Sequence, residues 1–89
     1  MTMRILWDER AWDDYLSWQT EDKKTLKKIN NLIKDMQRHP LTGIGKPEPL
    51  VENLSGWWSR RIDDKNRIVY KEQDGALIIA ACRGHYDDK

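Results

Sequence analysis

The chain has 89 residues, a net charge of +1 and a single cysteine, Cys82. This length suits one domain, and a lone cysteine excludes an internal disulfide and so argues against a disulfide-rich secreted scaffold. The N-terminus lacks the pattern of a signal peptide, and no stretch approaches the ~20 apolar residues of a membrane span. We therefore expect a soluble, cytoplasmic protein that does not bind a membrane.

The charge is unevenly distributed along the chain. Residues 23–61 carry nine basic and three acidic side chains, whereas residues 1–22 carry two basic and six acidic ones. A basic middle segment is compatible with a local phosphate-binding face. The lysines at positions 23, 24, 27 and 28 fit a solvated helix surface equally well, so both interpretations stay open.

The first elements in chain order are a short strand and a helix. Residues 5–7, Ile-Leu-Trp, have the composition of a strand. Asp8 is placed to cap a helix that runs to about residue 19, with Trp12, Tyr15 and Leu16 on one face.

Thr20 is expected to cap a second helix, with Glu21 and Asp22 in its first turn, where the helix dipole favours negative charge. Its apolar residues have the spacing of one buried stripe. They are Leu26, Ile29, Leu32, Ile33 and Met36. Pro40 is expected to end this helix.

Residues 41–56 form a segment of different character, rich in glycine and proline. Pro47 and Pro49 restrict the backbone on both sides of Glu48, so we expect a loop of defined shape. A long irregular segment inside a compact domain is usually functional.

Three β-rich runs follow, at residues 57–62, 67–72 and 76–82. Asp74-Gly75 is a strong hairpin signal between the last two. The last run is almost continuously apolar, as in a central strand buried on both faces, so Cys82 is expected to be a packed thiol rather than a reactive one. The order β-α-α-β-β-β predicts one α+β domain over residues 1–89, with two helices on one face of a mostly antiparallel sheet.

Residues suited to chemistry are concentrated in the second half of the chain. Glu48 is a lone carboxylate between two prolines, and Arg60, Arg61 and Arg67 place guanidinium groups on strands of a hairpin. His85 follows the last strand. In the hairpin, Arg67 falls roughly opposite residue 82, so we expect it at the same end of the sheet as His85.

This set of side chains fits RNA strand scission without a metal. One group must take the proton from the 2′-hydroxyl, another must protonate the leaving 5′-oxygen, and cations must hold the charge on phosphorus. Carboxylate, imidazole and guanidinium groups suit these roles. Each residue also has a simpler interpretation, because loop glutamates and terminal histidines are often only solvated and strand arginines often pair with carboxylates such as Asp63 or Asp64.

Other kinds of site are poorly supported by the sequence. No His, Cys or carboxylate cluster has metal-ligand spacing, and Gly43-Ile44-Gly45-Lys46 precedes prolines rather than a helix, so we expect neither a metal nor another cofactor. Ser17, Ser55 and Ser59 have no evident histidine partner for nucleophilic catalysis.

Segments spread over nearly the whole chain match one known family in a single register. They are Leu6-Trp7, Trp12-Asp13-Asp14-Tyr15-Leu16, Lys27-Lys28-Ile29-Asn30, Gly45-Lys46-Pro47-Glu48-Pro49-Leu50, Asn53-Leu54-Ser55-Gly56, Trp58-Ser59-Arg60-Arg61-Ile62, Arg67-Ile68-Val69-Tyr70 and Ile79-Ala80-Ala81-Cys82-Arg83-Gly84-His85-Tyr86. Together they closely resemble the YoeB toxins of the RelE-like superfamily of toxin–antitoxin ribonucleases. The Lys-Pro-Glu-Pro-Leu loop and the His-Tyr ending are the most specific part of this resemblance.

The resemblance implies a microbial-ribonuclease-like fold, cleavage of messenger RNA in the ribosomal A site, and control by a YefM-type antitoxin. On the matching positions it implies that Glu48 is the general base, Arg67 the phosphate-stabilising arginine and His85 the general acid. No metal is needed in this scheme.

Three further residues are expected to contact the substrate: Lys46, Arg61 and Tyr86. Two features depart from the family pattern. Val51 stands where relatives often have a basic residue, and Asp87-Asp88-Lys89 extends past the usual His-Tyr ending.

Two other classes of function stay open on the sequence. A non-catalytic RNA- or DNA-binding repressor would need the basic segment and the aromatics but neither Glu48 nor His85. A partner-binding module would use exposed tryptophans at a protein interface. Such an interface is expected in any case for binding the antitoxin. A second copy of the chain is a further candidate partner, which would form a homodimer.

Overall fold

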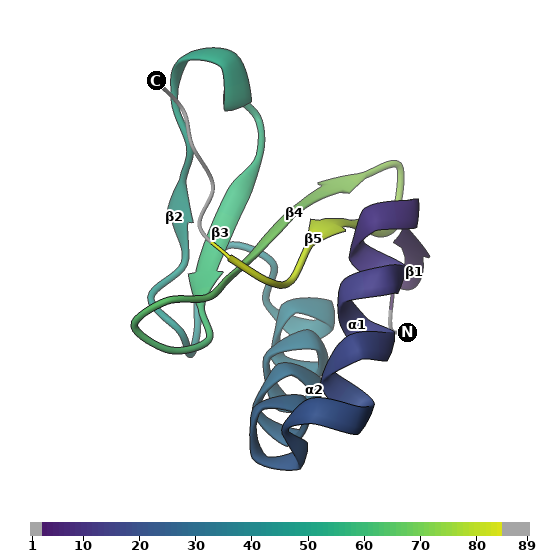
Figure 1. The fold of residues 1–89 in the computed structure, drawn as a ribbon. Helices are drawn as coiled ribbons and strands as arrows, with labels where there is room; N and C mark the ends of the chain where they lie inside the picture. Colours follow the sequence, from purple (N-terminus) through teal and green to yellow (C-terminus); the bar gives the residue numbers. More distant parts are fainter. Residues whose placement is uncertain (1–2, 85–89) are drawn as a thin grey trace.

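Two helices pack on one face of a five-stranded sheet in the computed structural model, which describes residues 3–84 (Figure 1). The strands are β1 (Arg4–Trp7), β2 (Glu48–Pro49), β3 (Trp58–Arg61), β4 (Arg67–Gln73) and β5 (Ala76–Ala81). The helices are α1 (Glu9–Glu21), α2 (Lys23–Arg38) and a short 3-10 helix at Glu52–Leu54.

The sheet order is β1-β5-β4-β3-β2, with β1 parallel to β5 and all other neighbours antiparallel. This confirms the expected α+β class and the mostly antiparallel sheet. The two-residue strand β2 was not expected, because it lies within the loop segment. Within residues 3–84, neither helix combines the length and apolar character that crossing a membrane requires.

The boundary between the helices lies at Asp22, and the prediction of a cap at Thr20 is wrong. Asp22 has an extended backbone, with φ −155° and ψ 99°, and its Oδ1 accepts hydrogen bonds from the backbone N–H groups of Lys24 at 3.1 Å and Thr25 at 3.2 Å. Thr20 remains inside α1, where its hydroxyl donates to the carbonyl of Ser17 at 3.3 Å. A carboxylate that satisfies two free amides stabilises the start of α2, whereas the Thr20 hydroxyl is already engaged within α1.

The core lies between the helices and the sheet. The expected stripe of α2 is buried at Ile29, Leu32, Ile33 and Met36, and Leu26 packs against its edge. The four lysines of the first two turns of α2 are exposed.

The expected apolar face of α1 is only partly buried. Ala11 and Trp18 are the buried residues of α1, whereas Trp12 and Leu16 keep 44% and 42% of their surface exposed. Ala11 is small enough to bring α1 against the end of β5, where the Cys82 thiol donates to the Ala11 carbonyl at 3.7 Å. The side of α1 that faces the core is therefore that of Ala11 and Trp18.

A β-bulge near the end of β5 determines how the chain leaves the sheet. Tyr70 pairs with Ile79 but Val69 pairs with Ala81, so Ala80 is an extra residue in β5. Tyr70 and Ile79 belong to the main core, whereas Val69 and Ala81 belong to a smaller cluster. Residue 82, which follows Ala81, lies in the main core again and is fully buried there.

The central position of β5 is confirmed, but burial on both faces is not complete. Leu77, Ile79 and Ala81 are buried, whereas Ile78 and Ala80 are only half-buried. Among residues 3–84, the helices cover one face of β5, and the small cluster around Leu50 covers part of the other.

Candidate functional site

Four residues expected to act on a substrate lie around one cavity of about 100 Å³. Lys46, Glu48, Arg61 and Arg67 line it together with Ser59. The strand register explains this grouping, since Glu48 pairs with Ser59 and Arg61 pairs with Arg67. Directly opposed residues in antiparallel strands place their side chains on the same face of the sheet, so the pairing brings β2, β3 and β4 to one site.

The electrostatic character of this cavity suits an anion. Three cationic side chains, from Lys46, Arg61 and Arg67, surround the single carboxylate of Glu48. Glu48 itself is exposed, so it is accessible to a ligand. A phosphate group bound among the cations would bring its neighbouring hydroxyl close to a carboxylate that can accept a proton. Within residues 3–84, no three His, Cys, Asp or Glu side chains gather to hold a metal ion.

The loop reaches the cavity by passing unusually close to α2. The carbonyl of Gly45 accepts a hydrogen bond from the backbone N–H of Arg61 at 2.7 Å. A Cβ at Gly45 would lie 2.7 Å from Cδ2 of Leu32, and the residue has a φ of +80°, so only glycine fits there. Lys46 follows with a φ of +51°, an uncommon conformation for a residue with a side chain. The local backbone thus directs Lys46 into the site.

Arg60, one of the strand guanidinium groups expected to be available for chemistry, belongs instead to the core. Its side chain is fully buried, and Nη1 donates to Asp35 Oδ2 at 2.6 Å and to the Ile44 carbonyl at 3.1 Å. Nη2 donates to the carbonyls of Thr42, at 2.8 Å, and His39. Arg60 therefore ties the start of the loop to α2 and β3 and supports the cavity from behind.

Arg67 is oriented by the turn that precedes β4. Its Nη1 donates to the carbonyls of Asp63 at 2.6 Å and Asn66 at 3.1 Å. The arginine therefore contacts the backbone of Asp63, not its carboxylate. Nε and Nη2 of Arg67 make no hydrogen bond to the described part of the chain, so they can face a ligand.

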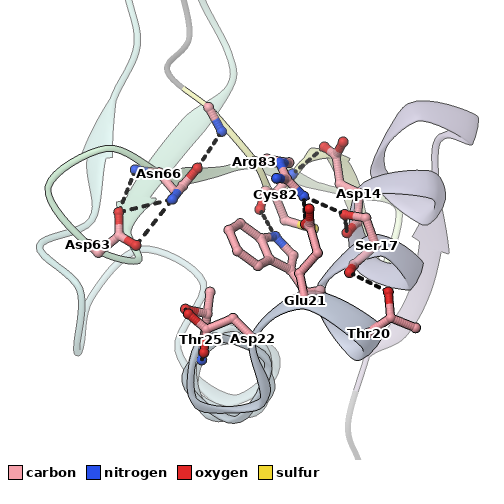
Figure 2. A network of polar contacts seen from close by, with 12 residues as sticks. Asp14, Ser17, Thr20, Glu21, Asp22, Thr25, Asp63, Asn66, Cys82 and Arg83 are labelled. Atoms are coloured by element: carbon pink, nitrogen blue, oxygen red, sulfur yellow. Dashed lines mark hydrogen bonds and ion pairs between the residues drawn. The ribbon is translucent and has the colours of Figure 1, made fainter.

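The same turn also binds the chain that follows β5, through the side chain of Asn66 (Figure 2). Asn66 Oδ1 accepts a hydrogen bond from the backbone N–H of Gly84 at 2.8 Å, and Asn66 Nδ2 donates to the Asp63 carboxylate at 3.1 Å. The backbone N–H of Arg67 donates to the Gly84 carbonyl at 3.0 Å. Arg67 therefore lies beside Gly84 rather than opposite Cys82, because the bulge shifts the register by one residue and the chain bends at residues 82–84. The sequence predicted a turn here but gave no signal that Asn66 binds the distant residue 84.

Helix α1 holds the end of β5 from the other side, as Figure 2 shows. The backbone N–H of Cys82 donates to Asp14 Oδ2 at 3.0 Å, and its carbonyl accepts from Trp18 Nε1 at 2.9 Å. The guanidinium group of Arg83 lies 4.5 Å from the centre of the Trp18 ring and forms an ion pair with Glu21. These contacts fix the last residues before position 85.

His85 and Tyr86 lie outside the described residues, as does the tail Asp87-Asp88-Lys89. The role of His85 as general acid and the contact of Tyr86 with the substrate therefore stay predictions. The structure locates the residue before His85 next to Arg67, through the two hydrogen bonds of Gly84.

Known proteins are similar to this chain in sequence and in fold. The sequence pattern of the YoeB-like toxins matches residues 7–86. Toxin YoeB of Escherichia coli strain K12 is 60% identical over 84 residues, which are 94% of this chain and 100% of that protein. Two solved structures from Staphylococcus aureus are also close in fold.

The YoeB dimer from S. aureus has a TM-score of 0.89 and 45% sequence identity, over 97% of this chain and 100% of that one. The YoeB–YefM complex from the same organism has a TM-score of 0.87 and 44% identity, with the same coverage. Agreement of sequence and fold over almost the full length shows the family. This chain belongs to the YoeB-like toxins of bacterial type II toxin–antitoxin systems.

Proposed function

We propose that this toxin is a ribosome-dependent endoribonuclease that cleaves messenger RNA in the ribosomal A site and so inhibits translation. The observation that carries this proposal is the cavity in which Glu48 stands among Lys46, Arg61 and Arg67. A carboxylate beside three cations is suited to a reaction in which a hydroxyl loses a proton while negative charge gathers on a phosphate.

The proposed reaction needs no activated water. Glu48 accepts the proton of the 2′-hydroxyl, and this oxygen attacks the adjacent phosphorus in line. The bond from phosphorus to the 5′-oxygen breaks, and His85 donates a proton to the departing oxygen. The products are a 2′,3′-cyclic phosphate and a 5′-hydroxyl, and a water can later open the cyclic product to a 3′-phosphate.

The cations of the cavity stabilise the charge on phosphorus in this scheme. Arg67 is held at Nη1 by two backbone carbonyls, so its guanidinium is oriented before the substrate arrives. Arg61 lies directly opposite it in the β3–β4 pair and adds a second guanidinium. Preorganised donors of this kind favour the transition state because no reorganisation is needed as charge develops. Lys46 and Tyr86 complete the proposed contacts with the substrate.

A YefM-type antitoxin is the proposed partner that neutralises this toxin in the cytoplasm. The YoeB–YefM complex of S. aureus supports this partner, and the YoeB dimer of the same organism supports a homodimer. A cationic cavity that binds RNA also suits an acidic peptide with a few apolar anchors. Expression of the toxin alone should therefore stop growth, and co-expression of its antitoxin should restore it.

The test is a purified translation system in which cleaved messages are mapped by primer extension. Wild-type protein should cut messages in the A site, whereas Glu48→Gln and His85→Ala should each lower the cleavage rate by roughly 10²–10⁴-fold. Glu52→Gln is the matched control, since Glu52 is an exposed glutamate of the same segment outside the cavity.

Unchanged cleavage by folded Glu48→Gln would contradict the catalytic assignment. If both catalytic variants still stop growth although they cut no RNA, the protein acts by binding, as a repressor would. Tolerance of high levels of the folded wild-type toxin without any antitoxin would contradict the proposed function altogether.

A further inference from the structure

A second cavity, of about 330 Å³, adjoins the cavity around Glu48. It lies between Lys28 and Asn31 of α2 and residues 44–46 of the loop, and it shares Lys46 and Arg61 with the first cavity. A chain bound at Glu48 can therefore continue into this space past two cations.

A third cavity, of about 190 Å³, extends the second one along α2. The two share Asn31 and Ile44, and the third is also lined by Lys34, Asp35 and Arg38. We call the second and third cavities together the α2 groove. It leads away from Glu48 between helix α2 and the loop that follows this helix.

The walls of the α2 groove are cationic. Lys28, Lys34 and Arg38 are exposed along it. Asp35 is the one carboxylate among the described residues that line it, and its Oδ2 is bound by Nη1 of the buried Arg60 at 2.6 Å. Because this acid is already paired, the groove presents an excess of positive charge to a ligand.

The groove also follows one side of helix α2 and has an exposed apolar residue in its wall. Lys28, Asn31, Asp35 and Arg38 have the spacing of one stripe along α2, and the helix rises about 15 Å over this stretch. Ile44 projects from the loop with 52% of its surface exposed and lines both cavities. Cations beside an apolar surface are what a single strand needs, because its phosphates and its unstacked bases must both be bound.

We propose that the α2 groove binds the single-stranded RNA segment that flanks the cleaved phosphodiester. Phosphates of this segment lie on Lys34 and Arg38, and one base packs on Ile44 within reach of the Asn31 amide. The inference rests on the proposed function for the identity of the ligand as RNA. An acidic peptide could meet the same charges, but the groove continues directly from the cavity of the cleaved phosphate, and this favours the RNA strand.

The first experiment separates groove cations from cations elsewhere on α2. The groove variant carries Lys34→Gln and Arg38→Gln. The control variant carries Lys23→Gln and Lys27→Gln, which remove the same charge from the same helix outside the groove. Binding of uncleavable 2′-O-methyl RNA of about three and about nine nucleotides is followed by fluorescence anisotropy.

Lengthening the RNA should tighten binding in wild type and in the control variant, and this gain should be lost in the groove variant. The dependence of log affinity on log salt is measured from about 50 to about 200 mM. For the longer RNA, the magnitude of this slope should be smaller by about 1.4 in the groove variant than in wild type, since two phosphate contacts are lost and each contributes about 0.7. Equal losses in the two variants would show a general charge effect and overturn the proposal.

A peptide of alternating Glu and Leu, matched in length to the longer RNA, serves as the competing probe. If the groove variant keeps its RNA affinity but no longer binds this peptide, the groove is a protein interface and the proposal is wrong.

The second experiment tests the base contact on Ile44. The matched control is Leu41→Ala, since Leu41 is 53% exposed in the same loop and lines neither cavity of the groove. An abasic nucleotide is placed at each position of the longer RNA in turn. At one of these positions it should weaken binding by wild type and by Leu41→Ala. The same replacement should have no effect on Ile44→Ala, and an undiminished effect there would overturn the base contact.

These binding measurements use RNA that cannot be cleaved, so their outcome is independent of catalysis. If Glu48→Gln cuts messages normally but the α2 groove binds RNA as described, the catalytic assignment fails and the groove stands. If Glu48→Gln is inactive but the groove variant binds RNA as the control variant does, the catalytic assignment stands and the proposed role of the α2 groove fails.

Discussion

The side chain of Asn66 accepts a hydrogen bond from the backbone N–H of Gly84 over 2.8 Å. The backbone carbonyl of Asn66 accepts another from the guanidinium of Arg67 at 3.1 Å. One residue therefore joins the proposed phosphate-binding arginine to the chain immediately before position 85. We therefore expect Asn66 to position Arg67 and, through Gly84, the chain that leads to position 85.

The first prediction concerns Asn66→Ala. This change leaves the partly buried Gly84 N–H unpaired, which costs about 1–3 kcal/mol of stability in urea denaturation. Cleavage should fall further than in Asp64→Ala, a change at an exposed residue of the same turn. The deficit should shrink on messages whose leaving 5′-oxygen is replaced by sulfur, because a thiolate departs without protonation. An equal deficit on both substrates would limit Asn66 to a structural role.

The second prediction compares two adjacent arginines. Arg60→Met should lower the free energy of unfolding by about 3 kcal/mol, because the half-buried Asp35 and three backbone carbonyls lose the buried guanidinium that binds them. Arg61→Met should change it by no more than about 0.5 kcal/mol, since Arg61 is exposed, but it should weaken RNA cleavage. Urea denaturation and cleavage assays on the same two preparations measure both effects. Similar stability of the two variants would contradict the assignment of Arg60 to the core.

The third prediction is an acid-dependent loss of stability at Asp35. The hydrogen bond from Arg60 holds the pKa of Asp35 below its ordinary value of 3.8. A carboxylate with a lowered folded-state pKa contributes its full stability above the unfolded value, and this contribution is lost as the pH falls through the folded value. The dependence of unfolding free energy on pH below 3.8 should therefore be weaker in Asp35→Asn than in wild type. Identical slopes in urea denaturation would refute this linkage, and Asp64→Asn is the control.

The fourth prediction concerns the thiol of Cys82. Burial raises its pKa to about 12, so almost none of it is thiolate near neutral pH. Iodoacetamide at about pH 8 should leave the native protein unmodified and should alkylate it once urea unfolds the chain, as measured by mass spectrometry. Rapid alkylation of the native protein would show that the end of β5 opens readily.

The fifth prediction follows from the proposed use of the 2′-hydroxyl as nucleophile. Since no metal-bound water takes part, EDTA should leave the cleavage rate unchanged once the magnesium needed for ribosome integrity is controlled. The measurement is cleavage on ribosomes whose sedimentation confirms that they are intact. Activity that returns only after a divalent ion is added back would contradict the mechanism.

Local sequence patterns determined most of the secondary structure of this protein. The apolar stripe of α2, the Asp74-Gly75 hairpin and the end of α2 before Pro40 depend on residues close together in the chain, so each could be predicted. The prolines that flank Glu48 also act on their immediate neighbours, so a restricted backbone could be predicted there, although strand β2 could not.

The residue types of the candidate site were also evident from the sequence, but their assembly was not. Nothing local indicates that Glu48 pairs with Ser59, because β2 is two residues long and is stabilised by β3. Likewise, the sequence does not distinguish Arg60 from Arg61, although alternation along β3 sends one into the core and the other to the cavity.

Only the tertiary structure decided how the end of the chain approaches the site. The extra residue Ala80 shifts the register of β5 against β4 by one, which returns Cys82 to the core, and the bend at residues 82–84 then brings Gly84 to Arg67. A bulge depends on side-chain packing on both faces of the sheet and on the contacts of α1 with the strand end, all between residues far apart in sequence. The sequence by itself therefore determined which residue types are present for chemistry, and the long-range packing determined which of them are accessible and which of them meet.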